Sequence, residues 1–379
     1  MRKLERKFGI LTLIAITAVS GGLASAQAQQ QPKQKADKKT LSPEEKAAAD
    51  FEKAQKRAKA SEAFFSGLTP IEVTLTTNIK RIRGDKKDDS PWRAATFTYT
   101  DTSGKPVTMP IEVRTRGIWR LKNCEFPPLR LNFKGEVTKG TIFQGIDKPK
   151  LVNYCRDTDE YEQYLIQEAQ LYRIYNLLTP ASHRMRLLTV SYADSASGKV
   201  IAKRTGYLLE EPEVMAARNG GPIMPLKGAI ASDLEPYHDA LVGVFNYLIG
   251  NTDWSIYALH NIELVNQPSG DILPVAYDFD FSGVINTHYA TPDPKLSIQR
   301  VRDRLFRGYC IDQSAWDKAF AKFIEQKEAI YALYSDSVGK MLNPKVVEQT
   351  LRYYDDFFKT ISDPKRARRE ITEDCVKTN

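Results

Sequence analysis

Polar residues suited to phosphoryl transfer are grouped between positions 250 and 283 of the 379-residue chain. Asp253 lies in the loop Gly250–Trp254, after a predicted helix. Asn261 stands where the next strand begins, and Asp278 and Asp280 follow the strand after it. Phosphoryl transfer needs a carboxylate to orient the attacking hydroxyl, and oxygen ligands to hold Mg²⁺ against the phosphates. The residue types and their order fit this chemistry.

A β-hairpin must position these side chains. Strands are predicted over 261–265 and 272–277, and their antiparallel pairing would let Asn261 and either Asp278 or Asp280 reach one metal ion. Hard oxygen ligands suit Mg²⁺ or Mn²⁺, with Ca²⁺ as a further option. Each motif also has a purely structural explanation: Asn-Thr-Asp is common in turns, and Asp-Phe-Asp occurs at strand ends where the acids face water. The combination favours a site.

Apolar residues alternate with polar ones through most of the first half, which predicts a mostly antiparallel sheet. The expected strands lie at 71–75, 97–99, 111–113, 129–133, 187–192 and 200–209. One helix is predicted there, over 158–178, with Asp157 and Glu160 as its capping box. The second half is predicted to be helical apart from the hairpin, with helices over 232–249, 313–333 and 345–359. The resulting fold class is α+β.

The same motifs, in this order, resemble the catalytic region of the CotH (spore coat protein H-like) family of secreted atypical kinases. Upstream, Arg116-Gly117 resembles the Arg-Gly segment of that family. The strand containing Arg130 resembles the one that bears its nucleotide-binding lysine, and residues 207–211 resemble the strand leading to its hinge. The resemblance covers about residues 70–310. It departs at Arg130, because arginine and lysine are not equivalent at a phosphate.

The resemblance implies a bilobal protein-kinase-like fold with a sheet-rich N-lobe and a helix-rich C-lobe. The expected divisions are a signal peptide (1–26), a disordered and helical linker (27–63), an N-lobe (64–211), a second linker (212–228) and a helical C-lobe with the catalytic loop and metal motif (229–379).

It also implies residue roles. Asp253 would be the catalytic base, Asn261 a metal ligand, and Asp278 or Asp280 the metal aspartate. ATP or another nucleotide would be bound with the help of four further residues: Arg130, Glu168, Arg116 and Glu211. Glu168 would pair with the basic residue that holds the phosphates, although a surface glutamate is the alternative.

Export is indicated by the first 26 residues. Basic residues at 2–7 precede an apolar stretch, and Ala24-Ser25-Ala26 fits a cleavage site, so the mature protein would be periplasmic or secreted. An uncleaved anchor is the alternative, but the stretch is short for a membrane span. No later segment is apolar enough to be a transmembrane segment. The four cysteines suggest disulfides, and Cys124 with Cys155 is the favoured pair.

The charge balance argues against nucleic acid as a partner. The formal net charge is +8, but the expected leader contributes much of it, and basic residues form no single stripe. The leading hypothesis is an exported, metal-dependent kinase-like transferase that acts on a protein hydroxyl. Its alternatives are an inactive pseudokinase used as a binding or envelope-assembly module, and a carboxylate-metal hydrolase that needs no nucleotide donor.

Overall fold

The computed structural model describes residues 41–378. The predicted signal peptide, its cleavage site and the Gln/Lys-rich segment therefore lie outside the described residues. From Pro43 onward the chain forms one compact unit. Among the described residues, no helix is both long enough and apolar enough to cross a membrane.

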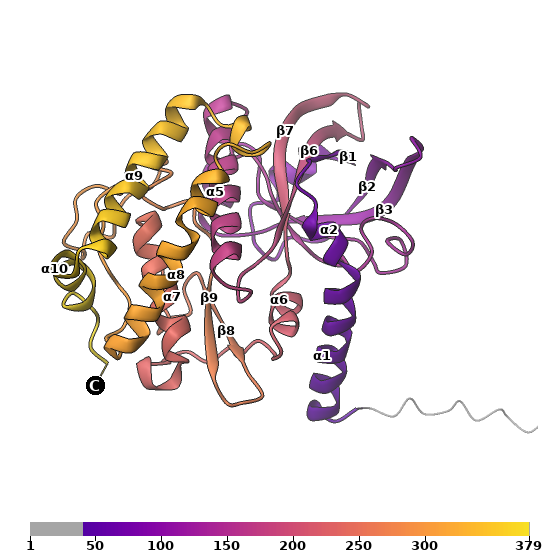
Figure 1. Cartoon of the computed structure of the whole chain (residues 1–379). Coiled ribbons are helices and arrows are strands. Elements are labelled where there is room, and N and C mark those ends of the chain that lie inside the picture. Colours follow the sequence, from indigo (N-terminus) through magenta and orange to yellow (C-terminus); the bar gives the residue numbers. More distant parts are fainter. Residues whose placement is uncertain (1–40, 379) are drawn as a thin grey trace, which may run out of the picture. The chain divides into compact units, whose positions relative to one another are not determined.

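Seven strands of the first half close into a barrel (Figure 1). They are β1 (Ile71–Thr77), β2 (Arg93–Thr100), β3 (Pro106–Thr115), β4 (Leu129–Asn132), β5 (Lys150–Val152), β6 (Met185–Asp194) and β7 (Val200–Leu209). Their spatial order is β1-β2-β3-β4-β5-β7-β6, and β1 pairs in parallel with β6 to close the ring. Inward-facing residues alternate along each strand and form the apolar core of the barrel, which includes Leu75, Phe97, Val113 and Leu131.

The closed barrel corrects the predicted fold. The bilobal kinase-like fold, with an open sheet as its N-lobe, is wrong because β1 and β6 leave no free edge between them. Alternation in the sequence identified six of the seven barrel strands, all except β5, since it depends on neighbouring residues. It gave no information on the pairing of two strands that lie far apart in the chain, which depends on long-range packing.

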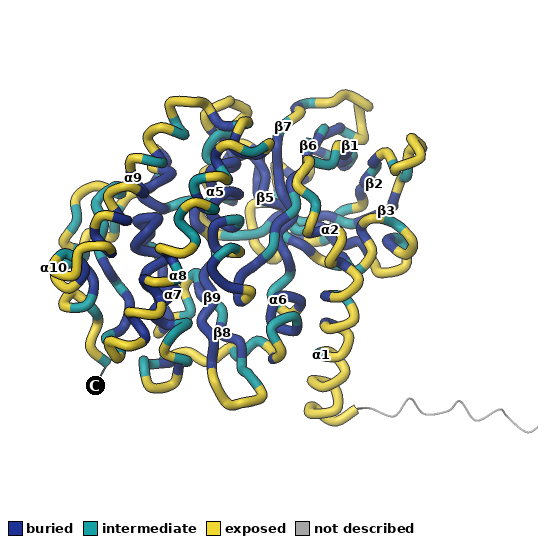
Figure 2. The backbone as a smooth tube through the Cα atoms, in the orientation of Figure 1, coloured by how far each residue is buried: buried dark blue, intermediate teal, exposed yellow. Residues whose placement is uncertain are grey.

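Most of the long helices pack together on one side of the barrel, and α1 lies apart from them (Figures 1 and 2). The longer ones are α1 (Pro43–Ala60), α5 (Asp159–Leu178), α7 (Pro236–Ile249), α8 (Gln313–Ala332) and α9 (Pro344–Ser362). Shorter ones are α2 (Glu62–Ser66), α3 (Ile79–Gly84), α4 (Trp119–Asn123), α6 (Pro212–Arg218) and α10 (Pro364–Ala367), with short 3₁₀ or π turns at Ala231–Asp233, Gly339–Met341 and Arg368–Thr372. A second apolar core joins α5 to α7, α8 and α9, and α5 touches the barrel strands β6 and β7 as well.

The predicted helices and hairpin are present, with different caps. The hairpin consists of β8 (Ile262–Asn266) and β9 (Ile272–Ala276), which pair antiparallel as predicted. The N-cap of α5 is Thr158, and no side chain closes the predicted capping box. Helix α7 begins later than predicted, with Glu235 as the N-cap that accepts hydrogen bonds from the amides of Tyr237 and His238. The predicted linker 212–228 contains α6.

Two disulfides cross-link the chain, and within residues 41–378 no cysteine is free. Cys124 bonds to Cys155, which confirms the predicted pair, and Cys310 bonds to Cys375. Disulfides persist in oxidising compartments. The two bonds therefore fit a secreted or periplasmic protein.

Candidate functional site

The loop that carries Asp253 is held by a glycine and an asparagine. Gly250 ends α7 with φ 65°, and a Cβ there would lie 2.0 Å from the hydroxyl of Tyr353, so only glycine fits. Asn251 is buried, and its Oδ1 accepts a hydrogen bond from the amide of Asp253 at 3.0 Å. The turn seen in the sequence is thus real, and it fixes the backbone that presents Asp253.

Both oxygens of the Asp253 carboxylate have partners. Nε2 of His260 lies 2.7 Å from Oδ1, and Nδ2 of Asn261 donates to Oδ2 at 3.2 Å and to the Asp253 carbonyl at 2.8 Å. Arg307 braces the loop by donating to the carbonyls of Thr252 and Trp254. The Asp253 side chain is still 42% exposed. It is therefore oriented by protein contacts and open to an incoming group.

The hairpin brings Asn261 and Asp278 to the same end. The amide of Tyr277 donates to the carbonyl of Asn261 at 3.1 Å, which places Asp278 one residue further along. Asn261 and Asp278 both have positive φ, 53° and 63°, a conformation that non-glycine residues adopt at a cost. Helix α5 holds the second strand end: the amide of Asp278 donates to the Tyr172 hydroxyl at 3.0 Å. The sequence analysis expected the hairpin to bring Asn261 close to Asp278 or Asp280, and for Asp278 the geometry agrees with that expectation.

Glu168 and Asp280 form the buried side of the site. Glu168 lies on α5 only 4% exposed, and its Oε1 accepts from the amide of Phe279 at 3.2 Å. Burial, and then the charge of Asp278, raises the pKa of Glu168 to about 7. The same causes raise the pKa of Asp280 well above its usual value. The hydroxyl of Tyr289 donates to Asp280 Oδ2 at 3.1 Å.

Three basic side chains from the barrel strands and their ends lie close together near Asp278. Arg130 on β4 and Lys150 on β5 are direct cross-strand partners, and Arg116 follows β3. The Nζ of Lys150 lies 4.6 Å from the ring centre of Tyr277, next to Asp278. Burial and then Arg116 lower the pKa of Lys150, while burial lowers the pKa of Arg116 although Asp278 opposes the shift. The cations thus crowd one another beside the carboxylates.

Arg120 adds a fourth cation on the buried side. It extends from α4 and donates to the carbonyl of Asn153 at 2.5 Å. Burial acts against its charge, but Tyr289, Asp280 and Glu168 together raise the pKa of Arg120. Its Nε has no hydrogen-bond partner among the described residues.

Glu211, the remaining residue that the sequence analysis assigned to the site, has its contacts outside this group. Glu211 forms an ion pair with Arg57 of α1, and its Oε1 accepts from the amides of Asp147 and Lys148 at 3.1 and 2.9 Å. It therefore fastens α1 to the loop before β5. The structure brings together the other predicted side chains around the hairpin end: Arg116, Arg130, Glu168, Asn261, Asp278 and Asp280. Asp253 joins them through Asn261.

Sequence reasoning missed Arg120, Lys150, His260 and Tyr289. His260 directly precedes Asn261, so a predicted hairpin end already placed it near Asp253. Lys150 lies in Pro149-Lys-Leu-Val152, too short an apolar run to be recognised as a strand. For Arg120 the sequence offers one indication, its position four residues before Cys124. Tyr289 has none, because only the tertiary structure brings its ring to Asp280.

The donor atoms present suit a hard cation. Asp278, Asp280 and the Oδ1 of Asn261 would supply carboxylate and amide oxygens, the ligands that Mg²⁺ and Mn²⁺ prefer. Within residues 41–378, however, no three His, Cys, Asp or Glu side chains are grouped closely enough to hold a metal by themselves. A cation would therefore need the amide oxygen of Asn261 and oxygens from a phosphate or water.

Comparison with known proteins leaves the family open. No protein-family model matches the sequence, and neither does any curated protein.

Proposed function

We propose that the protein is an exported, metal-dependent phosphotransferase that moves a phosphoryl group from a nucleotide to a protein hydroxyl. The observation that carries this proposal is the arrangement of cations on the neighbouring strands β4 and β5 and just after β3. Like charges placed directly opposite on two strands destabilise a sheet. Arg130 and Lys150 are such a pair, with Arg116 beside them. This unfavourable pairing is explained if a polyanion, such as a triphosphate, binds between the cationic side chains.

The carboxylates next to the cations distinguish transfer from simple anion binding. Asp278 lies near Lys150, and Asp280 lies near Asp278, so a divalent cation held by the two aspartates would neutralise phosphate charge between them and the donor. Lys150, Arg116 and Arg130 would hold the phosphate oxygens. Asn261 connects this end to Asp253 by one hydrogen bond.

Asp253 is the group placed to act on the acceptor. Its carboxylate is partly exposed and is held by His260 and Asn261, so an acceptor hydroxyl can approach it. Asp253 would orient that hydroxyl and accept its proton as the oxygen attacks phosphorus. The resemblance to the CotH family, which rests on the same residues, supports this assignment.

A second candidate is a non-catalytic anion-binding module that takes part in assembly of the cell envelope. It is favoured by one contact: the hydroxyl of Tyr289 occupies Asp280 Oδ2, which leaves one of the two aspartates capped. Such a module would keep the cations and bind a phosphorylated partner without transfer.

Calorimetry of the mature protein with ATP, alone and with Mg²⁺ or Mn²⁺, separates these candidates. The phosphotransferase requires metal-dependent ATP binding and, in a second experiment, incorporation of label from γ-labelled ATP into protein. ATP binding that does not depend on the metal, together with no labelling of protein, would favour the binding module. Absence of ATP binding with every divalent ion would reject the enzyme.

A further inference from the structure

Three aromatic side chains pack together beside Asp280. Trp119 comes from α4, and Phe281 and Tyr289 come from the chain after β9. The ring centres of Trp119 and Tyr289 are 4.9 Å apart, those of Phe281 and Tyr289 5.7 Å, and those of Trp119 and Phe281 6.0 Å. The Tyr289 hydroxyl also donates to Asp280. These three residues are termed the aromatic lid.

The cavity between Asp280 and helix α5 is too small for a phosphate. Arg120, Glu168, Asp280 and Tyr289 help to line this cavity of about 20 Å³. A cavity of that size has room for about one water molecule. A metal ion and a phosphate group therefore cannot both enter this cavity while Tyr289 keeps its position.

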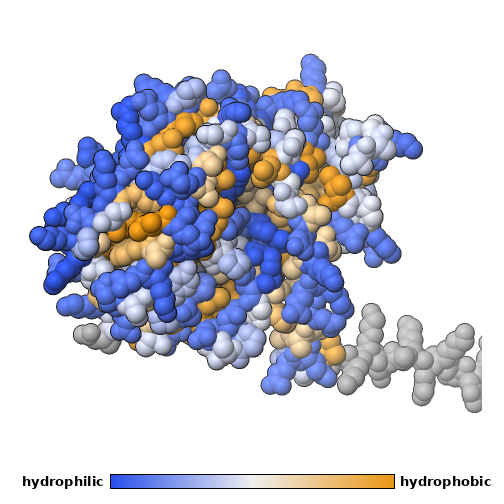
Figure 3. Space-filling view, in the orientation of Figure 1, coloured by the Kyte–Doolittle hydropathy of each residue, from blue (hydrophilic) through white to orange (hydrophobic). Residues whose placement is uncertain are grey.

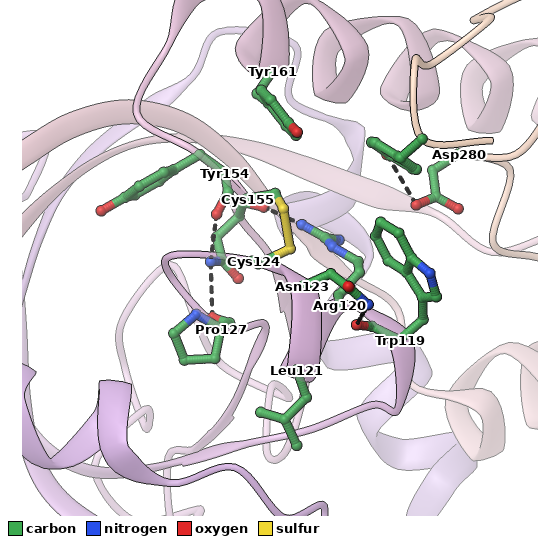
Figure 4. The surroundings of a disulfide bond; sticks show 12 residues. Trp119, Arg120, Leu121, Asn123, Cys124, Pro127, Tyr154, Cys155, Tyr161 and Asp280 are labelled. Atoms are coloured by element: carbon green, nitrogen blue, oxygen red, sulfur yellow. Dashed lines mark hydrogen bonds between the residues drawn. A yellow bond between two sulfur atoms is a disulfide. The ribbon is translucent and has the colours of Figure 1, made fainter.

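The Trp119 side of the lid is fixed covalently. Helix α4 ends at Cys124, and the disulfide joins that residue to Cys155, just beyond β5 (Figure 4). The amides of Glu125 and Phe126 both donate to the carbonyl of Cys155, and Arg120 donates to that of Asn153. This side is tied to the barrel at several points.

The Tyr289 side is held by noncovalent contacts alone. Residues 286–305 contain no helix or strand, and residues 291–299 are mostly exposed. Backbone hydrogen bonds near the lid are local, from Asn286 to Ser282 and from Ala290 to Thr287. His288 bonds to the Tyr161 hydroxyl at 3.0 Å, Thr287 Oγ1 donates to the Asp280 carbonyl at 3.2 Å, and the Tyr289 ring stacks on that of Tyr161 with 6.1 Å between ring centres. Side-chain contacts, and no covalent bond, thus keep this segment closed.

We propose that the aromatic lid gates Asp280, and that it opens by movement of residues 286–299 with Tyr289 while Trp119 stays in place on its disulfide-anchored helix. The inference rests on the proposed function in one respect, because the ligand admitted is a metal–nucleotide complex. A protein that must open before it binds has an apparent affinity reduced by the fraction of open molecules. The lid would therefore lower the affinity for Mn²⁺·ATP.

The test uses Tyr289→Phe, which keeps the ring and removes the hydroxyl that bonds to Asp280. Tyr257→Phe is the matched control, because Tyr257 is 61% exposed and lies outside the lid. Calorimetric titration of the mature protein with Mn²⁺·ATP should give a dissociation constant about tenfold lower for Tyr289→Phe, since the hydrogen bond to the Asp280 carboxyl group is lost only from the closed state. Tyr257→Phe should match the wild type.

Hydrogen exchange without ligand tests the lid independently of nucleotide binding. Amides of 286–299 should exchange faster in Tyr289→Phe, while those of 119–126 should not change. Replacing both Cys124 and Cys155 by serine should instead speed exchange at 119–126.

The outcomes separate the lid from the proposed function. Faster exchange at 286–299 without Mn²⁺·ATP binding by any variant would support the lid and reject the phosphotransferase. Measurable binding that Tyr289→Phe leaves unchanged would overturn the lid. So would unchanged exchange in that variant, or faster exchange at 119–126 in place of 286–299.

Discussion

Glu168 and Asp239 are both buried carboxyl groups, yet their surroundings differ completely. They are 4% and 2% exposed, and burial is the main cause that raises their pKa values, to about 7 for Glu168 and about 8 for Asp239. Glu168 accepts a backbone hydrogen bond and faces Arg120 and Asp278. Both oxygens of Asp239 lack a hydrogen-bond partner among the described residues, and the further cause of its pKa shift is Glu235.

The comparison shows that a raised pKa does not define a site by itself. Perturbed carboxyl groups mark functional sites when charged partners converge on them. Around Glu168 the chain gathers Asp278 and Asp280 from the hairpin end and Arg120 from α4. Around Asp239 it gathers apolar side chains of the helical core. Substitutions near Glu168 should thus alter function, and substitution of Asp239 should alter only stability.

The largest functional effect is expected from Asp253→Ala. Loss of a general base slows a reaction by about 10²–10⁴-fold, so labelling from γ-labelled ATP should fall by that factor. ATP binding should stay within about twofold of wild type, because Asp253 faces the acceptor and not the donor. Calorimetry and a labelling time course measure the two quantities on the same preparation. Equal losses of binding and transfer would place Asp253 on the donor side.

Replacing Asp278 and Asp280 together by asparagine should have the next largest effect. Their loss leaves triphosphate charge uncompensated, since no metal would be held beside it. Residues that only support metal ligands contribute about 10–100-fold to metal affinity. Loss of the ligands themselves should therefore raise the dissociation constant for Mn²⁺·ATP by at least about 100-fold. Binding of ATP without metal should change little. If metal-dependent binding persists in the double variant, the cation is held elsewhere.

Lys150→Met should weaken ATP binding by about tenfold to a hundredfold. A hydrogen bond to a charged group contributes about 1.5–3 kcal/mol, and the Nζ of Lys150 lies over the ring of Tyr277, next to Asp278. Lys148→Met is the control, because Lys148 lies two residues before it with an exposed side chain. The same titration of both variants checks the assignment. Similar affinities for the two would show that Lys150 does not touch the phosphates.

These predictions depend partly on residues that the sequence revealed and partly on residues that it did not. The hairpin was predictable because its strands are local and Asn261 and Asp278 flank them. The Cys124–Cys155 bond was also found, although spacing alone permits other pairs. Barrel closure and the position of Lys150 were not predictable, since β5 has only three residues and gains its place from β4 and β7.

The surface adds little to what the interior shows. On the face drawn in Figure 3, hydrophilic side chains predominate, with smaller apolar areas among them. The larger surface hollow near α9 is lined by Arg300, Arg304 and Arg369, each already paired with a carboxylate. Paired surface charges of this kind contribute little free energy. Most cations of this hollow thus already have carboxylate partners, whereas Arg116, Arg130 and Lys150 crowd one another on and beside β4 and β5.

Asp239→Asn should have the smallest effect on function and a pH-dependent effect on stability. The unfolded chain loses the Asp239 proton near pH 4, whereas the folded protein keeps it up to about pH 8, because burial raises the pKa. Unfolding between these values releases a proton, so wild-type stability falls as pH rises from 4 to 8 and then levels off. Asparagine has no proton to lose and removes this slope.

Asp239→Asn tests whether Asp239, unlike Glu168, affects stability alone. Each unit of pKa difference is equivalent to about 1.4 kcal/mol, so the free energy of unfolding of the Asp239→Asn variant should exceed that of wild type by a few kcal/mol at pH 8 and differ much less at pH 5. Urea unfolding at both pH values measures this difference. ATP binding should be unchanged throughout, because Asp239 has no charged partner in the site. If Asp239→Asn instead weakened ATP binding, a buried carboxyl group without partners of opposite charge would affect function as Glu168 is expected to do. The distinction between Asp239 and Glu168 would then fail.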